Sequence, residues 1–202
     1  MKIAEIFLSA QGEGARMGEP AVFVRLAGCS LRCEFCDTPR AISGGREMTV
    51  AGIMREVSRL APFPGIQVVI TGGEPLEQDL AQLVIELSRS RFFLSVETNG
   101  LHYQDLAIHW WAVAPKPAAG YRTDPRIRCL AHEVKLVVVP ELTVDVVKTL
   151  RRQMPRAIFY LQPNAREKNG CRTTGEFFRQ CVSDGIRGLR LGLQLHRIYR
   201  IP

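Results

Sequence analysis

The 202-residue sequence contains no apolar run that approaches the roughly 20 residues needed to span a bilayer. Its opening stretch, MKIAEIFLSAQGEG, is apolar only briefly, because Glu5 interrupts it and no small-residue cleavage site follows. We therefore expect a strand there and not a signal peptide, which makes a cytoplasmic protein without a membrane partner the expectation. The sequence also lacks repeats, low-complexity segments and a Ser/Gly-rich linker, so we expect a single domain over residues 1–202.

A basic arm is missing as well. Lys and Arg outnumber Asp and Glu by 27 to 20, and the net charge of +7 permits an anionic partner. The basic residues are dispersed, however, and the groups at 89–92 and 151–152 are short. This distribution favours a solvated surface with a few anion-binding arginines over direct nucleic-acid binding.

The cysteines lack the second pair that a zinc site usually has. Three of the six lie in GCSLRCEFCDT, residues 28–38, whereas Cys129, Cys171 and Cys181 stand alone and are interpreted as structural or surface thiols. A zinc knuckle would have to borrow a fourth ligand such as His132 or Cys129. An iron–sulfur cluster, in contrast, tolerates three protein ligands and leaves one iron open for catalysis.

Short apolar segments rich in β-branched or aromatic residues predict the strands. These are residues 3–8, 21–28, 66–72, 92–98, 110–115, 132–139, 157–163 and 189–196. Helical periodicity covers 49–60, 79–90, 143–153 and 173–185. The alternation predicts an α/β fold with a mostly parallel sheet. Because 101–109 is too short for a crossover helix and 115–131 is irregular, we expect an incomplete (β/α) barrel with some crossover helices missing.

Polar signatures follow several of these strands directly. The cysteines follow strand 21–28, and the stretches TGGEP, ETNG, APK and QPNA begin at residues 71, 97, 114 and 162. The carboxyl ends of parallel strands are where such folds bind ligands. The sequence therefore predicts one binding site built from these strand ends.

The pattern C-x-x-x-C-x-x-C, with Phe35 just before its last cysteine, resembles the signature of the radical S-adenosylmethionine (radical SAM) superfamily. The resemblance implies that Cys29, Cys33 and Cys36 hold a [4Fe–4S] cluster whose fourth iron is chelated by SAM. It also implies a set of SAM-binding residues at the strand ends. These are Gly73, Glu74, Glu97, Asn99, Ala114, Pro115, Lys116, Gln162, Pro163, Asn164 and Ala165.

Within that superfamily, the stretches IFLSAQGEG, FVRLAGC and CDT resemble the 7-carboxy-7-deazaguanine synthase family over nearly the whole chain. The resemblance implies that 6-carboxy-5,6,7,8-tetrahydropterin undergoes a radical ring contraction with loss of ammonia, on the route to queuosine and related deazapurines. The SAM-derived radical abstracts the hydrogen, so no side chain is assigned a catalytic role. A flavodoxin or ferredoxin-type reductant and a homodimer are further implications.

The family resemblance also implies a substrate pocket. Its residues are Ala10, Gln11, Gly12, Glu13, Arg25, Thr71, Gln194, His196 and Pro202. The planar guanidinium of Arg25 suits the substrate carboxylate, and the terminal carboxylate of Pro202 is expected to reach the pterin. Thr38 is implied to hold Mg²⁺ together with substrate and water. An ordinary loop hydroxyl at Thr38 and a structural histidine at 196 remain alternatives.

Two other functions remain open from the residues. A small glycyl-radical-enzyme activase shares the cysteines and the short length, but it leaves QGEG at 11–14 unexplained. A zinc-dependent nucleic-acid-binding module would make use of the +7 charge.

Overall fold

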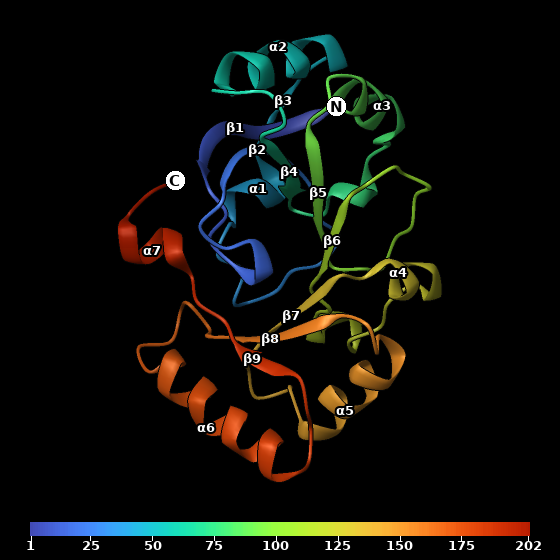
Figure 1. Cartoon of the computed structure of the whole chain (residues 1–202). Helices are drawn as coiled ribbons and strands as arrows, with labels where there is room; N and C mark the ends of the chain where they lie inside the picture. The colour runs from blue at the N-terminus through green and yellow to red at the C-terminus, as the bar shows by residue number, and fades with distance from the viewer.

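The computed structural model describes the whole chain, Met1–Pro202, as one nine-stranded sheet that curls around a central cavity (Figure 1). The order of the strands across the sheet is β3-β1-β2-β4-β5-β6-β7-β8-β9. The strands are β1 (Lys2–Ala10), β2 (Pro20–Leu26), β3 (Arg46–Glu47), β4 (Gln67–Gly72), β5 (Phe93–Thr98), β6 (Trp110–Val113), β7 (Glu133–Val137), β8 (Ile158–Gln162) and β9 (Leu189–Leu191). The sheet does not close on itself, as the sequence predicted for an incomplete barrel.

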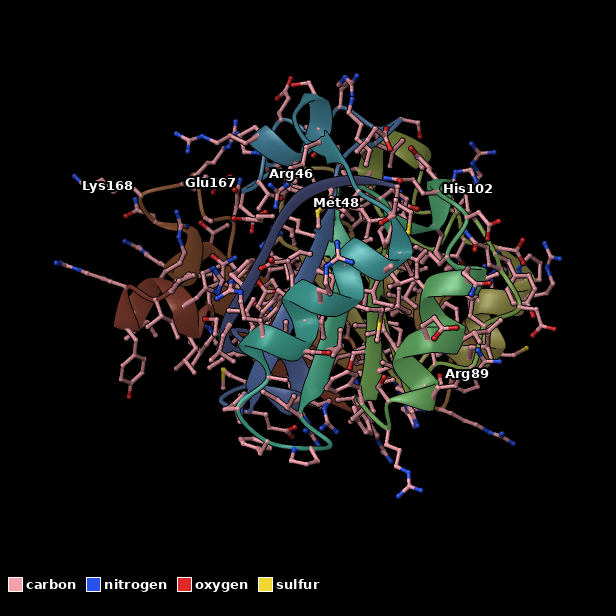
Figure 2. The ribbon with its side chains drawn as sticks, turned by 90° about the horizontal axis from the view of Figure 1, so that it is seen from above. Arg46, Met48, Arg89, His102, Glu167 and Lys168 are labelled. Carbon is pink, nitrogen blue, oxygen red and sulfur yellow. The ribbon has the colours of Figure 1, made fainter.

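Helices cover the outer face of the curled sheet (Figures 1 and 2). The seven helices of the chain are α1 (Arg40–Ser43), α2 (Val50–Leu60), α3 (Ala81–Arg89), α4 (Pro125–Leu130), α5 (Val144–Gln153), α6 (Gly170–Ser183) and α7 (Leu195–Tyr199), of which α1 and α7 also contribute residues to the cavity lining. Three short 3₁₀ helices complete the elements: η1 (Gly14–Arg16), η2 (Pro75–Glu77) and η3 (Pro117–Ala119). The four predicted helices are confirmed as α2, α3, α5 and α6, and Thr49 and Thr143 cap two of them by accepting from backbone N–H groups.

β2 and the strands from β4 to β9 form the parallel part of the sheet, and their side chains alternate between two environments. Along β4, Val68 and Ile70 belong to the main cluster of 35 buried apolar residues under the helices. Val69, between them, packs with Ala21 and Phe23 in a separate small cluster on the cavity side. This alternation lets the same strands build a core outside the barrel and a polar site inside it.

The first strand runs against the expectation of a barrel strand with the common direction. β1 pairs with β2 in antiparallel register, with Ala10 opposite Pro20. The connection over residues 11–19 is too short for a crossover and forms a hairpin instead. As a result, the residues that follow β1 leave the sheet at the amino end of β2. The cysteines, in contrast, follow the carboxyl end of β2.

Two sequence expectations need correction. The predicted strand 189–196 ends at Leu191, because Gly192 lies against the Gln162 side chain and α7 begins soon after. The segment 115–131, predicted to be irregular, contains η3 and α4. Asp124 caps α4 and Pro125 opens it, a start signal that the sequence carried. Residues 101–109 contain no helix, as predicted.

The C-terminal segment spans the open side of the barrel between β9 and β1 (Figure 1). The N–H of Leu195 donates to the carbonyl of Gly12 at 2.8 Å, and the Ser9 hydroxyl donates to the carbonyl of Pro202 at 2.7 Å. These bonds hold α7 against the hairpin that follows β1, so the chain itself closes the side that the sheet leaves open.

The surface carries its positive charge in a dispersed form. Figure 2 shows Arg46, Arg89 and Lys168 pointing outward at separate places around the molecule. None of the helices combines the length and the apolar composition that crossing a membrane requires.

Candidate active site

A cavity of about 450 Å³ lies inside the curled sheet. This volume is within the range of roughly 300–1,000 Å³ that is usual for small-molecule sites. All of the site residues predicted from the sequence line it except Pro115 and Asn164. Asn164 has a local role instead: its side chain donates to Glu167 and accepts from the N–H of Arg166, which fixes the turn after β8.

The three motif cysteines line the part of this cavity that follows the carboxyl end of β2. Cys29, Cys33 and Cys36 are free thiols of intermediate exposure. Two arginines hold their loop, since Arg32 donates to the carbonyl of Cys29 at 2.6 Å and Arg166 donates to that of Cys36 at 2.7 Å. Burial raises the pKa of the Cys29 and Cys33 thiols above the ordinary value.

The glycine turn after β4 packs directly against the cysteine loop. A Cβ on Gly73 would lie 2.0 Å from the Gly28 carbonyl oxygen, so no other residue fits without displacing the loop. The N–H of Glu74 donates to the same carbonyl at 2.8 Å. The TGGEP stretch therefore positions the cysteines in addition to lining the cavity.

The donor set fits an iron–sulfur cluster better than a single metal ion. No three His, Cys, Asp or Glu side chains lie close enough together to hold one ion. In a cluster each thiolate binds a different iron, so the three sulfurs lie farther apart than the ligands of one ion do. His132, the fourth zinc ligand considered above, accepts from the N–H of Trp111 through Nδ1, and it does not line the cavity.

Glu74 is almost fully buried, with 1% of its surface exposed. Its carboxylate accepts from the Thr98 hydroxyl at 2.6 Å and from the N–H groups of Asn99 and Leu76 at 2.7 and 3.1 Å. Burial raises its pKa, although these three donors oppose the effect. The carboxylate thus ties the end of β5 to the glycine turn, next to the cysteine loop.

Two amide side chains at the strand ends leave polar atoms without a partner, although the Oδ1 of Asn99 accepts from the N–H of Leu101 at 2.9 Å. Both polar atoms of the Gln162 amide and the Nδ2 of Asn99 are buried and make no hydrogen bond. Both residues line the cavity. Because buried polar groups are normally satisfied, these amides indicate places where a bound molecule completes the hydrogen bonding.

The opposite end of the cavity is a polar network that we call the floor: Gln11, Glu13, Thr71, Glu97, Lys135 and Gln194. The Lys135 ammonium donates to Glu13 at 3.0 Å and to Glu97 at 2.8 Å. The second oxygen of Glu97 accepts from the Thr71 hydroxyl at 3.1 Å, and that of Glu13 accepts from the Gln194 amide at 2.9 Å. Gln11 donates to Glu97 at 3.2 Å.

The charges in the floor fix its protonation. Burial by itself would raise the pKa of Glu97, but the Lys135 ammonium outweighs burial and lowers that pKa to about 2. Burial likewise opposes the charge on Lys135, yet Glu13, Glu97 and Glu133 raise its pKa well above the ordinary value. At neutral pH the floor therefore holds the Lys135 ammonium beside an ionised Glu97.

An aromatic and cationic wall stands beside the floor. Phe7 and Phe23 stack with ring centroids 5.0 Å apart, and the Arg25 guanidinium lies 5.6 Å from the centre of the Phe7 ring. Glu5 accepts from Arg25 Nε at 2.7 Å. The chain provides no partner for the remaining guanidinium nitrogens, so they are available to an anion in the cavity.

The residues below the floor seal the barrel. Arg16 of η1 donates to Gln67 at 2.9 Å and lies 3.9 Å from the centre of the Phe93 ring. Gln67 in turn donates to Ser95 at 2.8 Å. These contacts fill this end of the barrel with side chains.

His196 lies against the QGEG segment, and Thr38 lies beside the last of the motif cysteines. A Cβ on Gly12 would lie 2.1 Å from His196 Nδ1, which shows how closely the histidine covers the QGEG segment. The Thr38 hydroxyl lies 4.0 Å from Cys36 Sγ and 3.4 Å from Asp37 Oδ1. Both residues line the cavity, as do Pro202 and Lys116.

Sequence reasoning missed Lys135 and the two phenylalanines. Lys135 lies inside the apolar segment HEVKLVVV, and Phe7 and Phe23 lie inside equally apolar strands. These three residues share one feature of the sequence. Side chains of a strand alternate between its two faces, and each of the three lies on the face that lines the cavity. That signal was available for Lys135, because a charged residue in the middle of a buried strand requires a partner.

Comparison with known proteins agrees with this geometry. The profile described as the Radical SAM superfamily matches residues 23–111. The 7-carboxy-7-deazaguanine synthase of Koribacter versatilis (strain Ellin345) is 45% identical, with 100% of this chain and 98% of the relative covered. That of Bacteroides thetaiotaomicron is 34% identical, covering 99% of this chain and 98% of the relative.

A solved structure extends the likeness to three dimensions. The crystal structure of QueE from Escherichia coli superposes with a TM-score of 0.74 at 26% identity, covering 96% of this chain and 94% of that one. The fold, the cysteine loop and the full-length similarity lead to one assignment. The chain belongs to the 7-carboxy-7-deazaguanine synthase family of the radical SAM superfamily.

Proposed function

We propose that this chain is a 7-carboxy-7-deazaguanine synthase that converts 6-carboxy-5,6,7,8-tetrahydropterin to 7-carboxy-7-deazaguanine with loss of ammonia. The observation that carries the proposal is the shared cavity. Three thiols suited to a cluster line the same cavity of about 450 Å³ as a preformed polar floor and an arginine with free guanidinium nitrogens. Relatives similar over their full length carry the synthase name.

In this proposal Cys29, Cys33 and Cys36 hold a [4Fe–4S] cluster, and SAM binds beside it at the strand ends. When bound there, the cluster and SAM would supply the radical chemistry of the reaction. The Gln162 amide and the unpartnered Nδ2 of Asn99 support this part, since both offer hydrogen bonds to a bound molecule. The glycines of the β4 turn let backbone groups approach it closely.

The chain's own residues bind and orient the pterin. The free nitrogens of Arg25 form a two-bond pair with the substrate carboxylate. The flat Phe7 and Phe23 rings beside it exclude water from the adjoining wall. Gln194, His196 and Pro202 cover the open side of the barrel, and Pro202 supplies an acceptor for the N–H groups of the pterin ring.

In this proposal Glu97 accepts hydrogen bonds from the substrate, although the sequence interpretation assigned it to the ribose of SAM. The reason is its surroundings, since its carboxylate contacts Gln11, Thr71 and Lys135. As an ionised carboxylate it accepts hydrogen bonds and does not donate a proton at neutral pH. Thr71, which donates to it, is the floor residue that directly precedes the glycine turn.

The finer assignments also belong to the proposal. Thr38 helps to bind Mg²⁺ together with the substrate carboxylate and water, in keeping with the few protein ligands that Mg²⁺ commonly has. A flavodoxin or ferredoxin-type protein supplies the electron, and the enzyme works in the cytoplasm as a homodimer without direct nucleic-acid contact. The +7 charge is compatible with an acidic electron donor.

The names of the relatives favour the synthase over the glycyl-radical-enzyme activase. A synthase also accounts for the QGEG segment, because Gln11 and Glu13 both contribute to the floor. An activase, which acts on a large protein partner, has no use for acceptors buried at that depth.

The test is turnover by anaerobically purified protein with a reconstituted cluster. The pterin, SAM, Mg²⁺ and dithionite are supplied, and the deazaguanine product is followed by its absorbance and mass. We expect product from the wild type, none from Arg25→Met, and undiminished product from the exposed control Arg59→Met. Absence of product from fully reconstituted wild type would overturn the proposal.

A further inference from the structure

Lys135 is a buried cation that neither the sequence motifs nor the cofactor sites explain. It lies on the cavity side of β7, with 7% of its surface exposed, and its ammonium contacts Glu13 and Glu97. Isolated buried charges are costly, so such a lysine persists where its partners need it. Its two partners, Glu13 and Glu97, each make further hydrogen bonds in the floor, and these bonds indicate the role of Lys135.

The contacts join four distant segments at a single point. Glu13 comes from the hairpin after β1 and is also bound by Gln194 of the C-terminal segment. Glu97 comes from β5 and is also bound by Thr71 of β4. Glu13 is therefore held by two donors and Glu97 by three, since Gln11 also donates to Glu97, and Lys135 is the donor that the two carboxylates share.

We propose that Lys135 is a positioning residue that fixes the Glu13 and Glu97 carboxylates as paired hydrogen-bond acceptors for the N–H groups of the substrate's ring. The proposal rests on the proposed function, since it takes the pterin as the occupant of the floor. It adds a residue that sets the geometry and charge of the acceptors without itself reacting.

The physical argument is the repulsion that the ammonium prevents. Without a cation between them, two neighbouring carboxylates cannot both ionise freely, and the pKa of one rises strongly. Other charges replace it only in part: Glu133 adds negative charge from β7, and Arg25 on β2, which is also bound to Glu5, lowers the pKa of Glu97 less than Lys135 does. A protonated floor would offer the substrate a donor where it needs an acceptor.

The test compares Lys135→Met, which keeps the length but removes the charge, with the wild type and with a control, Lys148→Met. Lys148 forms an exposed ion pair with Asp184 on the outer surface. We expect Lys135→Met to raise KM for the pterin by roughly 30-fold or more, with a smaller effect on kcat. Its KM should vary with pH through the neutral range, where those of the wild type and of the control stay flat.

Infrared spectra give a readout that does not depend on turnover. Lys135→Met should show a protonated carboxyl band at neutral pH that is absent from the wild type and disappears in Lys135→Met/Glu13→Gln. If Lys135→Met does not fold, Lys135→Arg replaces it: the retained charge should keep the pH profile flat while the altered geometry raises KM.

The outcomes separate the two proposals. An unchanged KM with a flat pH profile in Lys135→Met, or the absence of the carboxyl band, would overturn the role of Lys135. Where Lys135→Arg replaces Lys135→Met, a KM equal to that of the wild type would likewise overturn the role of Lys135. If the wild type does not turn over the pterin, the proposed function fails, and so does the substrate part of this inference. The infrared band would then still decide whether Lys135 keeps the two carboxylates ionised.

Discussion

The floor and the cysteine end of the cavity differ in how their polar groups are satisfied. In the floor, Lys135, Glu13 and Glu97 bond to one another and to neighbouring side chains within the chain. At the cysteine end, the Nδ2 of Asn99 and both polar atoms of the Gln162 amide make no hydrogen bond within the chain, and the three thiols are free. The floor is therefore built in advance for its ligand, whereas the cysteine end needs cofactors to complete its bonds.

The electrostatics follow the same division. Opposite charges in the floor lower the pKa of Glu97 and raise that of Lys135, so both groups stay charged. Near the cysteines burial dominates and raises the pKa of Glu74 and of the Cys29 thiol. Preorganised polar groups cost little reorganisation when a ligand binds, which suits the end that we assign to the substrate.

The largest effect is expected at the cysteine end. Cys33→Ser should abolish turnover and the brown colour of the reconstituted protein, because a three-ligand set that loses one ligand no longer holds the cluster firmly. Substrate turnover and iron content of anaerobic samples measure it. Cys171→Ser, at an exposed position on α6, is the control and should keep both. Equal iron content in the two variants would contradict the assignment of the cluster.

Gly73→Ala should have the next largest effect. The new Cβ would lie 2.0 Å from the Gly28 carbonyl oxygen and would push the cysteine loop away from the glycine turn. We expect loss of cluster incorporation and a destabilisation of about 1–3 kcal/mol, measured by urea unfolding. Gly175→Ala is the matched control within α6, where a Cβ meets nothing within 4 Å. It should stabilise the protein by about 0.5–1 kcal/mol. Equal responses at both sites would show that the turn does not support the loop.

Glu74→Gln tests the tie between β5 and the glycine turn. An amide replaces one acceptor oxygen by a donor, which then faces the N–H groups of Asn99 or Leu76 or the Thr98 hydroxyl. We expect a loss of about 1–3 kcal/mol in the free energy of unfolding, seen as a lower urea midpoint. The exposed control Glu176→Gln should change the midpoint little. A wild-type midpoint in Glu74→Gln would mean that these bonds are dispensable.

The smallest effect concerns acid stability of the floor. Because the folded pKa of Glu97 is about 2, below its ordinary value of 4.5, the unfolded chain takes up the proton first as the pH falls. The stabilisation by Glu97 is therefore complete above pH 4.5 and is lost between 4.5 and about 2. Urea midpoints measured across this range should decline less steeply in Glu97→Gln than in the wild type. If the urea midpoints of the two proteins declined equally steeply with falling pH, Glu97 would not be ion-paired in the folded protein.

The cysteine end could be predicted from the sequence because its residues are adjacent in the chain. The cysteine spacing is local, and stretches such as TGGEP directly follow apolar strands whose carboxyl ends meet in a parallel sheet. The open barrel followed from the same alternation of strands and helices. Asn164 shows the limit of such predictions from local sequence. It lies within the QPNA stretch, yet its side chain hydrogen-bonds to Glu167 in the turn that follows β8.

The floor was harder to predict because its contacts join residues far apart in sequence. Lys135 meets Glu13 across 122 positions, and the direction of β1 decides whether they meet at all. The sequence interpretation named Gln11 and Glu13 through the family resemblance, but it did not supply their partner. A charged residue at an inward position of an apolar strand, as at Lys135, is the pattern that points to such a network.

Hydrogen exchange before and after cofactor loading tests the contrast between the two ends most directly. Protein without a cluster is compared with protein that carries the reconstituted cluster and SAM, and exchange is followed by peptide mass spectrometry. The account predicts increased protection over residues 28–40 and 98–100, with residues 11–13 and 133–137 unchanged. Equal gains at both ends, or a gain confined to the floor, would contradict a preformed floor facing an end that the cofactors complete.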